Sequence, residues 1–345
     1  MTRLTRYSLT LCSFLALSLP VVVLCQQGTP AHPNPVNPHP YIPAKPNIKV
    51  AQHVPAPSPA GSALSDLQRF RDSRQLNHLL SSTVDPDHED AGVESDPLGG
   101  GPYTGAFALH AVYKTGSIQL KLPANATRTQ ILYAPTTRPP NGSCLEVGTA
   151  YMTDITTKQT SASVYVYDFC KPGGSDFAIP PIAVDGQLPP IVVDDDFMAT
   201  YAGAVTNNHI PAYAVAIFTP DSAVSGTSTW NAELFNYKTK EWETKYSGHG
   251  SFTADPRGWS IFETYFQAGL CSESLPPLGA DQLAFFNPNS QAWEALAHQM
   301  QKLSLHISTG GSQNNNCFVA DQTGPASYKV APTPPEFYQW QVLSQ

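Results

Sequence analysis

The sequence predicts an all-β fold, an antiparallel two-sheet β-sandwich or jelly roll. About a dozen short apolar runs, separated by turn residues, follow one another from Tyr103 onward. The composition agrees, because only 13% of residues are charged and the chain holds 33 prolines and 23 glycines, which suits short strands joined by turns. Runs of strong helix formers are scarce. We expect the sandwich to occupy residues 98–345, after a mostly unstructured, Pro-rich N-terminal region with one short helix.

The first 25 residues predict a secretory signal peptide. A basic start with Arg3 and Arg6 precedes an apolar run from Leu9 to Leu24, and Gln26 and Gln27 follow. The run is short for a membrane-anchoring helix. The expected localisation is therefore secreted and extracellular, with no membrane association.

Residues 26–97 are expected to form a Pro-rich linker, a short helix and an acidic linker. Ten prolines between residues 28 and 60 rule out ladders and helices there. Residues 62–80 place leucines and a phenylalanine at helical spacing, and residues 83–97 are acidic without apolar periodicity, which predicts disorder. This region suits a propeptide that covers a cleft until it is cut away. A stalk with a spacer helix is the alternative.

The body of the chain predicts strands in order. They are GAFALHAVY, GSIQLKL, RTQILYAP, SCLEVGTAYM, SASVYVYDFC, PAYAVAIF, TWNAELFNY, EWETKYSG, GWSIFETYF, QLAFFNP, QAWEAL and SYKVAP. Residues 236–239 and 287–289 predict hairpin turns. Two segments are ambiguous: residues 194–205 suit a short helix, and residues 295–305 suit a helix or a strand.

Four cysteines follow the predicted signal peptide, an even number that suits disulfides in an oxidising compartment. Three pairings are possible among Cys144, Cys170, Cys271 and Cys317. Pairing Cys144 with Cys170 and Cys271 with Cys317 closes a loop within each half and is favoured. A structural zinc site would need close CxxC or HxxxH spacing, which is missing, so we expect no metal and no cofactor.

The charge and the motifs exclude several functions. A net charge of −8 without clustered Lys and Arg argues against a nucleic-acid partner. The chain has no GxSxG elbow, no HExxH helix and no GxxxxGK[ST] loop. Carboxylates, amides and phenols remain as the groups that can carry chemistry.

Two glutamates stand in otherwise apolar strands. Glu146 lies between Leu145 and Val147, and Glu263 lies in RGWSIFETYF. Burying an ionised carboxylate is costly unless it is paired or hydrogen-bonded, so both positions suggest a function. We expect the two to face each other across the sandwich and to share a proton. The alternative is that each is an ordinary glutamate on a solvated sheet face.

Strand alternation groups further residues around each glutamate. Trp259, Ile261 and Tyr265 share the face of Glu263, with Phe262 and Phe266 opposite, and Gly148 shares the face of Glu146. Gly148 leaves room for a close approach to the backbone. The remaining acids, which include Glu233, Glu241, Glu243 and Asp194–Asp196, lie beside polar residues and are expected to be solvated.

Three segments in this order resemble the neprosin-like glutamic peptidases. GAFALHAVY followed by TRTQILYAP resembles the "GA-x-A … SQIW" opening of the catalytic domain of that family. SCLEVGTAYMTD followed by VYVYDFC resembles the stretch around its first catalytic Glu, and RGWSIFETYF the strand with its second. The resemblance covers about residues 103–266, and no single motif is specific. It departs from the family at Thr149, where a Trp is expected, and in a Trp259 to Glu263 spacing of four instead of three.

The resemblance implies a secreted, acid-active glutamic endopeptidase with a removable pro-region, possible cleavage next to proline, and a peptide or protein substrate. Glu146 and Glu263 would be the catalytic pair. The candidates for substrate or oxyanion contacts are Gln130, Tyr265 and Trp259. Two alternatives stay open. Aromatic residues, including four of the tryptophans, suit a carbohydrate-binding jelly roll, and a polysaccharide lyase or glycoside hydrolase would use the same two carboxylates.

Overall fold

A computed structural model describes residues 88–95, 103–122, 124, 126, 130–170, 191–206, 208–253, 257–266, 275–295, 305–311, 328–332 and 340–344. All of them belong to one compact unit, Asn37–Gln345. The predicted signal peptide, the Pro-rich stretch and the predicted helix at 62–80 lie outside the described residues. Within these ranges, no helix is long and apolar enough to cross a membrane.

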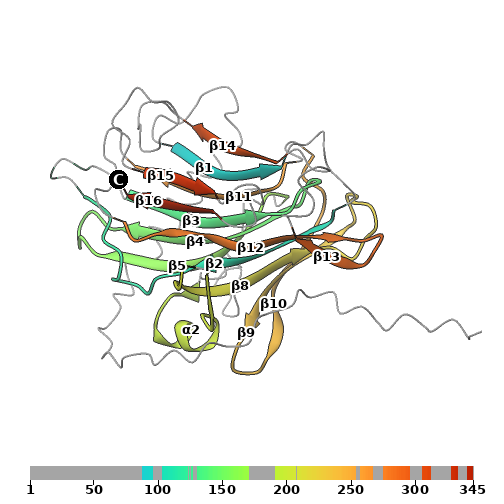
Figure 1. The fold of residues 1–345 in the computed structure, drawn as a ribbon, viewed down its shortest axis with the longest axis horizontal. Coiled ribbons are helices and arrows are strands. Elements are labelled where there is room, and N and C mark those ends of the chain that lie inside the picture. The colour runs from blue at the N-terminus through green and yellow to red at the C-terminus, as the bar shows by residue number, and fades with distance from the viewer. Residues whose placement is uncertain are drawn as a thin grey trace, which may run out of the picture. The chain divides into compact units, whose positions relative to one another are not determined.

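The described strands form two antiparallel sheets packed as a sandwich, which confirms the predicted fold class (Figure 1). The seven-stranded sheet runs β14-β1-β11-β3-β4-β5-β6. Its strands are β1 (His88–Ser95), β3 (Gln130–Arg138), β4 (Leu145–Thr153), β5 (Thr160–Asp168), β6 (Ile191–Val192), β11 (Trp259–Tyr265) and β14 (Leu305–Gly311).

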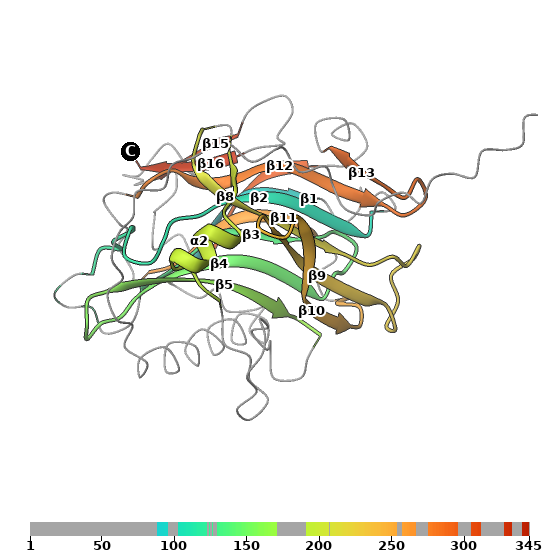
Figure 2. The same cartoon turned by 90° about the horizontal axis from the view of Figure 1, so that it is seen from below.

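The nine-stranded sheet runs β10-β9-β8-β2-β12-β16-β15, with β13 paired to β12 and β7 to β8. In Figure 2, β4 and β5 lie on one side of the sandwich and β12 and β16 on the other. The strands are β2 (Gly105–Ala111), β7 (Ala204–Val205), β8 (Pro211–Phe218), β9 (Thr229–Asn236), β10 (Glu241–His249), β12 (Leu278–Asn287), β13 (Ala292–Ala295), β15 (Tyr328–Pro332) and β16 (Trp340–Ser344).

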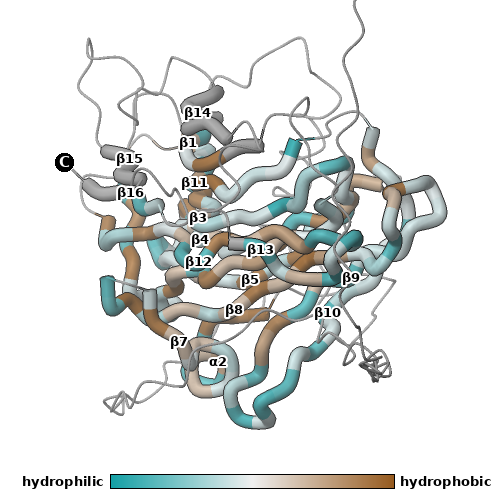
Figure 3. The backbone as a smooth tube through the Cα atoms, turned by 45° about the vertical axis from the view of Figure 1, so that its right-hand side comes forward, coloured by the Kyte–Doolittle hydropathy of each residue, from teal (hydrophilic) through white to brown (hydrophobic). Residues whose placement is uncertain are grey.

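The main hydrophobic core lies between the sheets, and alternate residues of each strand supply it. Leu132, Val147 and Phe262 come from the seven-stranded sheet, and Val215 and Trp230 from the other. In Figure 3, hydrophobic stretches follow the strands, whereas hydrophilic segments gather at turns. Phe262 and Phe266 belong to this core, so they lie on the face opposite Glu263, as strand alternation predicts.

A buried polar network crosses the core. The His110 imidazole contacts the Tyr213 hydroxyl at 2.9 Å and the Thr137 hydroxyl at 2.7 Å. Thr137 donates to Ser260, which also accepts from the Trp340 indole N–H, and Thr149 bonds Tyr213. The network therefore joins strands of both sheets through residues that are all buried.

The acidic segment departs from its prediction. Residues 88–95, expected to be part of a disordered linker, form β1, which pairs with β11 on one side and β14 on the other. Ala91 and Val93 point into the core, and the two apolar positions were too few to stand out in an acidic run. The folded sheet therefore begins before residue 98, at His88.

The structure bears on the other local predictions. GSIQLKL forms turns and irregular backbone instead of a strand, although Ile118 and Leu120 are buried. The short helix predicted within 194–205 is α2 (Asp195–Thr200), with Asp194 as its N-cap. Both hairpin turns are confirmed, and Asn236 and Asn287 each accept backbone N–H groups two residues ahead. Of residues 296–304, nothing is described.

Candidate active site on the outer face of the seven-stranded sheet

The site lies on the outer face of the seven-stranded sheet, which we define as the face that points away from the nine-stranded sheet. A second hydrophobic cluster covers it, and its members come from β3, β4, β5 and β11 only. The cluster comprises Ile131, Tyr133, Ala150, Met152, Tyr165, Tyr167 and Tyr265, with Phe169 packed against it. Tyr133 makes edge contacts with Tyr165 and Tyr265 at ring distances of 5.6 and 5.5 Å.

Glu146 is fully buried on this face and is held by two donors. The Tyr165 hydroxyl donates to Oε1 at 2.7 Å, and the Trp259 indole N–H donates to Oε2 at 2.9 Å. The side chain is 0% exposed. Hydrogen bonds to a carboxylate stabilise its charged form and offset the cost of burial. This arrangement excludes the alternative of a solvated glutamate at this position.

Gly148 makes the approach of Tyr165 possible. A Cβ atom at position 148 would lie 2.8 Å from the Tyr165 hydroxyl oxygen and 3.0 Å from Cγ2 of Thr136. The predicted close approach at this glycine is therefore present, and the group that approaches is the phenol that holds Glu146. Because that phenol lies over Gly148, the Glu146 carboxylate leans along β4 toward Gly148.

Arg138 packs against Trp259, the residue whose indole N–H donates to Glu146. Its guanidinium carbon lies 4.6 Å from the ring centre of Trp259 and 4.9 Å from those of Phe169 and Phe252. The side chain is fully buried, and its Nε donates to the backbone oxygen of Ser143 at 3.0 Å. A guanidinium enclosed by aromatic faces is stabilised by cation–π attraction. It fixes the indole that donates to Glu146.

Glu263 lies on the same face and is 5% exposed. It pairs with Tyr133 of β3 on one side and with Asp90 of β1 on the other. Ala91 and Val93 point into the core, so alternation turns Asp90 toward the outer face. Residues directly opposite on antiparallel strands have Cβ atoms about 5 Å apart. The strand that sequence reasoning took for a linker thus brings a further carboxyl beside Glu263.

The two glutamates belong to one sheet, so the expectation that they face each other across the sandwich is wrong. Strand β3 separates them, and Ile261, Thr136 and Gly148 form one row across the three strands. Glu146 lies two residues from that row in one direction and Glu263 two residues in the other. Strand spacing of about 4.8 Å and a rise of about 3.3 Å place their Cα atoms about 16 Å apart. The two carboxyls therefore flank this row diagonally.

The spacing of four between Trp259 and Glu263 has a simple geometric consequence. Pairing of β1 with β11 is continuous from Trp259 to Tyr265, so residues an even number apart share a face. Trp259, which donates to Glu146, and Tyr265, which belongs to the outer cluster, bracket Glu263 on that face.

The three candidates for substrate or oxyanion contacts have different positions. Trp259 and Tyr265 lie on the outer face. Gln130 does not, because it lies two residues before Leu132 on β3 and shares the inward face of Leu132, which belongs to the main core. Gln130 therefore points between the sheets, away from the face that carries Glu146 and Glu263, and its role in substrate contact stays a prediction.

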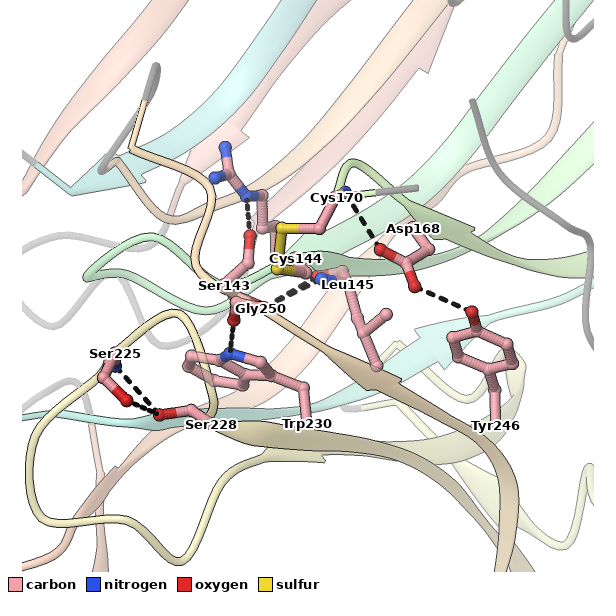
Figure 4. Close-up of a disulfide and its surroundings, with 11 residues drawn as sticks. Ser143, Cys144, Leu145, Asp168, Cys170, Ser225, Ser228, Trp230, Tyr246 and Gly250 are labelled. Atoms are coloured by element: carbon pink, nitrogen blue, oxygen red, sulfur yellow. Dashed lines mark hydrogen bonds between the residues drawn. A yellow bond between two sulfur atoms is a disulfide. The ribbon is translucent and has the colours of Figure 1, made fainter. Parts of the chain in front are cut away.

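The Cys144–Cys170 disulfide confirms one predicted bridge and closes the end of the hairpin that carries Glu146 (Figure 4). Asp168 lies beside it, accepting from the Cys170 N–H at 2.9 Å and the Tyr246 hydroxyl at 2.7 Å. Cys144, Cys170 and Asp168 are close enough to suggest metal ligands. Both sulfur atoms are bonded to each other, however, and are no longer thiolates. Cys271 and Cys317 lie outside the described residues.

Two further expectations need correction or refinement. Glu233, expected to be solvated, is 7% exposed in β9, where Thr244 donates to it at 3.0 Å and burial raises its pKa. Of the tryptophans suggested as sugar platforms, Trp230 and Trp259 are buried. Trp242 and Trp293 are partly buried and pack against the cluster around Phe107 on the nine-stranded sheet.

Comparison with known proteins gives a distant likeness. The fold is similar to that of a scytalido-glutamic peptidase crystallised with a peptide-based transition-state analogue, with a TM-score of 0.38 and 9% identity over 76% of this chain and 100% of that chain. No family model matches the sequence, and no curated protein matches it.

Proposed function

We propose that this protein is an acid-active glutamic endopeptidase in which Glu146 and Glu263 activate a water molecule. The observation that carries the proposal is the buried Glu146 carboxylate, oriented by Tyr165 and Trp259 on the face that Glu263 shares. Burial with directed donors is how active sites prepare a carboxylate for a defined role. The sequence resemblance to neprosin-like peptidases independently selects the same two residues.

The reaction needs no side-chain nucleophile. The oxygen of a water molecule attacks the peptide carbonyl carbon while an ionised carboxylate takes one proton from that water. The other carboxyl, protonated, donates its proton to the leaving amide nitrogen as the C–N bond breaks, so that a carboxylic acid and an amine result. Because one carboxyl must be protonated, activity has an acidic optimum, and ionisation of both carboxyls abolishes turnover. By resemblance, the substrates contain proline.

Both glutamates are buried in this conformation, so neither side chain can contact a peptide substrate. Substrate binding therefore requires a structural change that exposes them. We infer that proteolytic removal of an N-terminal pro-region supplies this change. A cut at residue 97 would remove β1 from between β11 and β14. The cut therefore lies before His88, so that the mature enzyme retains β1 and Asp90. N-terminal sequencing of acid-treated protein tests this boundary.

A carbohydrate-binding function is the second candidate, and one observation favours it. Trp242 and Trp293 lie within 6.2 and 6.3 Å of the Phe107 ring on the nine-stranded sheet. Both indoles keep some solvent contact. Aromatic faces of this kind stack on sugars. This surface is on the other sheet from Glu146 and Glu263, so replacing the glutamates would leave glycan binding intact.

The deciding experiment compares three matched variants of the matured protein. Glu146→Gln keeps the shape, since its amide oxygen accepts from Trp259 and its NH₂ donates to the Tyr165 oxygen. Glu263→Gln removes the second carboxylate. Glu233→Gln is the control, a buried strand glutamate on the other sheet. We expect the first two to lose digestion of a denatured protein at acid pH and the control to keep it. Retained activity in the first two variants, or turnover only of a polysaccharide panel, would reject the peptidase.

A further inference from the structure

The Thr136 hydroxyl, like the Tyr237 hydroxyl and the Trp293 indole N–H, is a buried polar group without a hydrogen-bond partner among the described residues, and of these three it is the one on the seven-stranded sheet. The Thr136 side chain is 0% exposed. Other buried threonines of this sheet are satisfied, as Thr137 bonds His110, Thr149 bonds Tyr213 and Thr153 bonds Thr160. Buried polar groups normally have partners, and one that does not needs an explanation, for which an ordered water or a catalytic role are the usual ones.

The backbone of β3 brings this hydroxyl to the outer face. Pairing with both neighbours shifts by one residue between Tyr133 and Thr136, which is a β-bulge at residues 134–135. Pro135 suits a bulge because it has no N–H to donate to a ladder. Without the extra residue, alternation from Tyr133 would turn Thr136 into the core. The bulge instead directs it outward, beside the Cβ position of Gly148.

Thr136 lies between the two glutamates on the outer face of the sheet. It occupies the middle of the row that separates them, opposite Ile261 on β11 and Gly148 on β4. Glu146 and Glu263 lie on the two diagonals from it, each two residues along its own strand. A water bonded to Thr136 Oγ1 would therefore lie between the two strands that carry the carboxyls. Neither carboxyl needs to cross the full distance between the two strands.

We propose that Thr136 positions the attacking water, its Oγ1 accepting one hydrogen while the ionised glutamate takes the other. This inference rests on the proposed function and adds a third side chain to it. Threonine suits the task because a hydroxyl accepts and donates without changing charge in the acidic range. With one hydrogen held by Thr136 and one by the carboxylate, the water's lone pair is directed to the substrate carbonyl carbon. No further reactant enters the step.

The test is Thr136→Val, which replaces the hydroxyl by a methyl group of the same shape. We expect kcat to fall about tenfold or more with KM within twofold, because orientation of the water is lost while the surface is kept. Thr136→Ser restores the hydroxyl and recovers kcat to within about threefold. Thr149→Val is the matched control on the opposite face. It breaks a bond to Tyr213, so it lowers the melting temperature and leaves kcat unchanged.

A crystal structure that shows ordered water provides a readout besides activity. We expect a water on Thr136 Oγ1 in the wild-type protein and none at that place in Thr136→Val. Wild-type kcat in Thr136→Val, or no water on Oγ1, overturns the inference. If Glu146→Gln and Glu263→Gln are inactive while Thr136→Val is fully active, this inference alone fails. If those two glutamine variants stay active, the proposed function fails, and this inference fails as well.

Discussion

Protonation of His110 sets a limit on the acid stability of the fold. Burial lowers the pKa of His110 from 6.5 to about 3, because the imidazole is fully enclosed between the sheets. The groups that face it, the Tyr213 and Thr137 hydroxyls, carry no charge, and burial raises the pKa of Tyr213 far above this range. Between pH 6.5 and pH 3, His110 is therefore neutral in the folded state and protonated in the unfolded chain.

The sign and size follow from linkage. The unfolded state binds more protons between pH 6.5 and pH 3, so the free energy of unfolding falls as pH falls through this window. At about 1.36 kcal/mol per pKa unit, His110 removes about 2 kcal/mol by pH 5 and about 4 kcal/mol by pH 3, relative to neutral pH. Proteins of this kind have free energies of unfolding of about 5–15 kcal/mol. His110 alone therefore removes a large fraction of the total stability in the acidic range where the proposed enzyme works.

The assay is denaturant unfolding at several pH values for the wild type and His110→Gln. Glutamine keeps hydrogen-bonding groups for Tyr213 and Thr137 but does not titrate. Other carboxyls affect both proteins alike, so the difference between the two curves isolates His110. We expect the wild type to lose about 2 kcal/mol more than the variant between pH 7 and pH 5. Parallel curves across this range would refute the reasoning.

Three further predictions concern the site and its support. Replacing Cys144 and Cys170 by Ala should lower the free energy of unfolding by about 3 kcal/mol, measured in denaturant, because the bridge closes a loop of 26 residues; an unchanged midpoint would contradict this. Gly148→Ala should displace Tyr165 from Glu146, costing about 1–3 kcal/mol of stability and most of the activity, and a fully active, equally stable variant would be inconsistent with that contact. Asp90→Asn removes a negative charge opposite Glu263, so one limb of the pH–activity profile should move to lower pH, and an unmoved profile would show that the two carboxyls do not interact.

The sequence predicts the sandwich and one disulfide well, because strand periodicity, turn residues and nearby cysteines are local signals. It also singles out Glu146 and Glu263, since a carboxylate among apolar strand residues stands out. It does not show which strands pair with one another or in which register. Tyr165, the donor to Glu146, comes from a neighbouring strand whose register is invisible in the sequence.

Other features could not be predicted from the sequence, again for physical reasons. The strand β1 was not predicted, because Ala91 and Val93 are the only apolar side chains in a run that is otherwise acidic, polar or glycine. Thr136 reaches the outer face only through the bulge at Pro135, which simple alternation does not foresee. Alternation from Leu132, which faces the core, places Gln130 between the sheets.

The central claim, that Glu146 and Glu263 act as one unit, is tested most directly by the double variant. Its turnover of a proline-containing peptide at acid pH is compared with that of the two single glutamine variants. Residues that act in one step lose their effect together, so the account predicts that the double variant is no slower than the slower single variant. Losses that multiply in the double variant would show that the two carboxyls work independently and would contradict it.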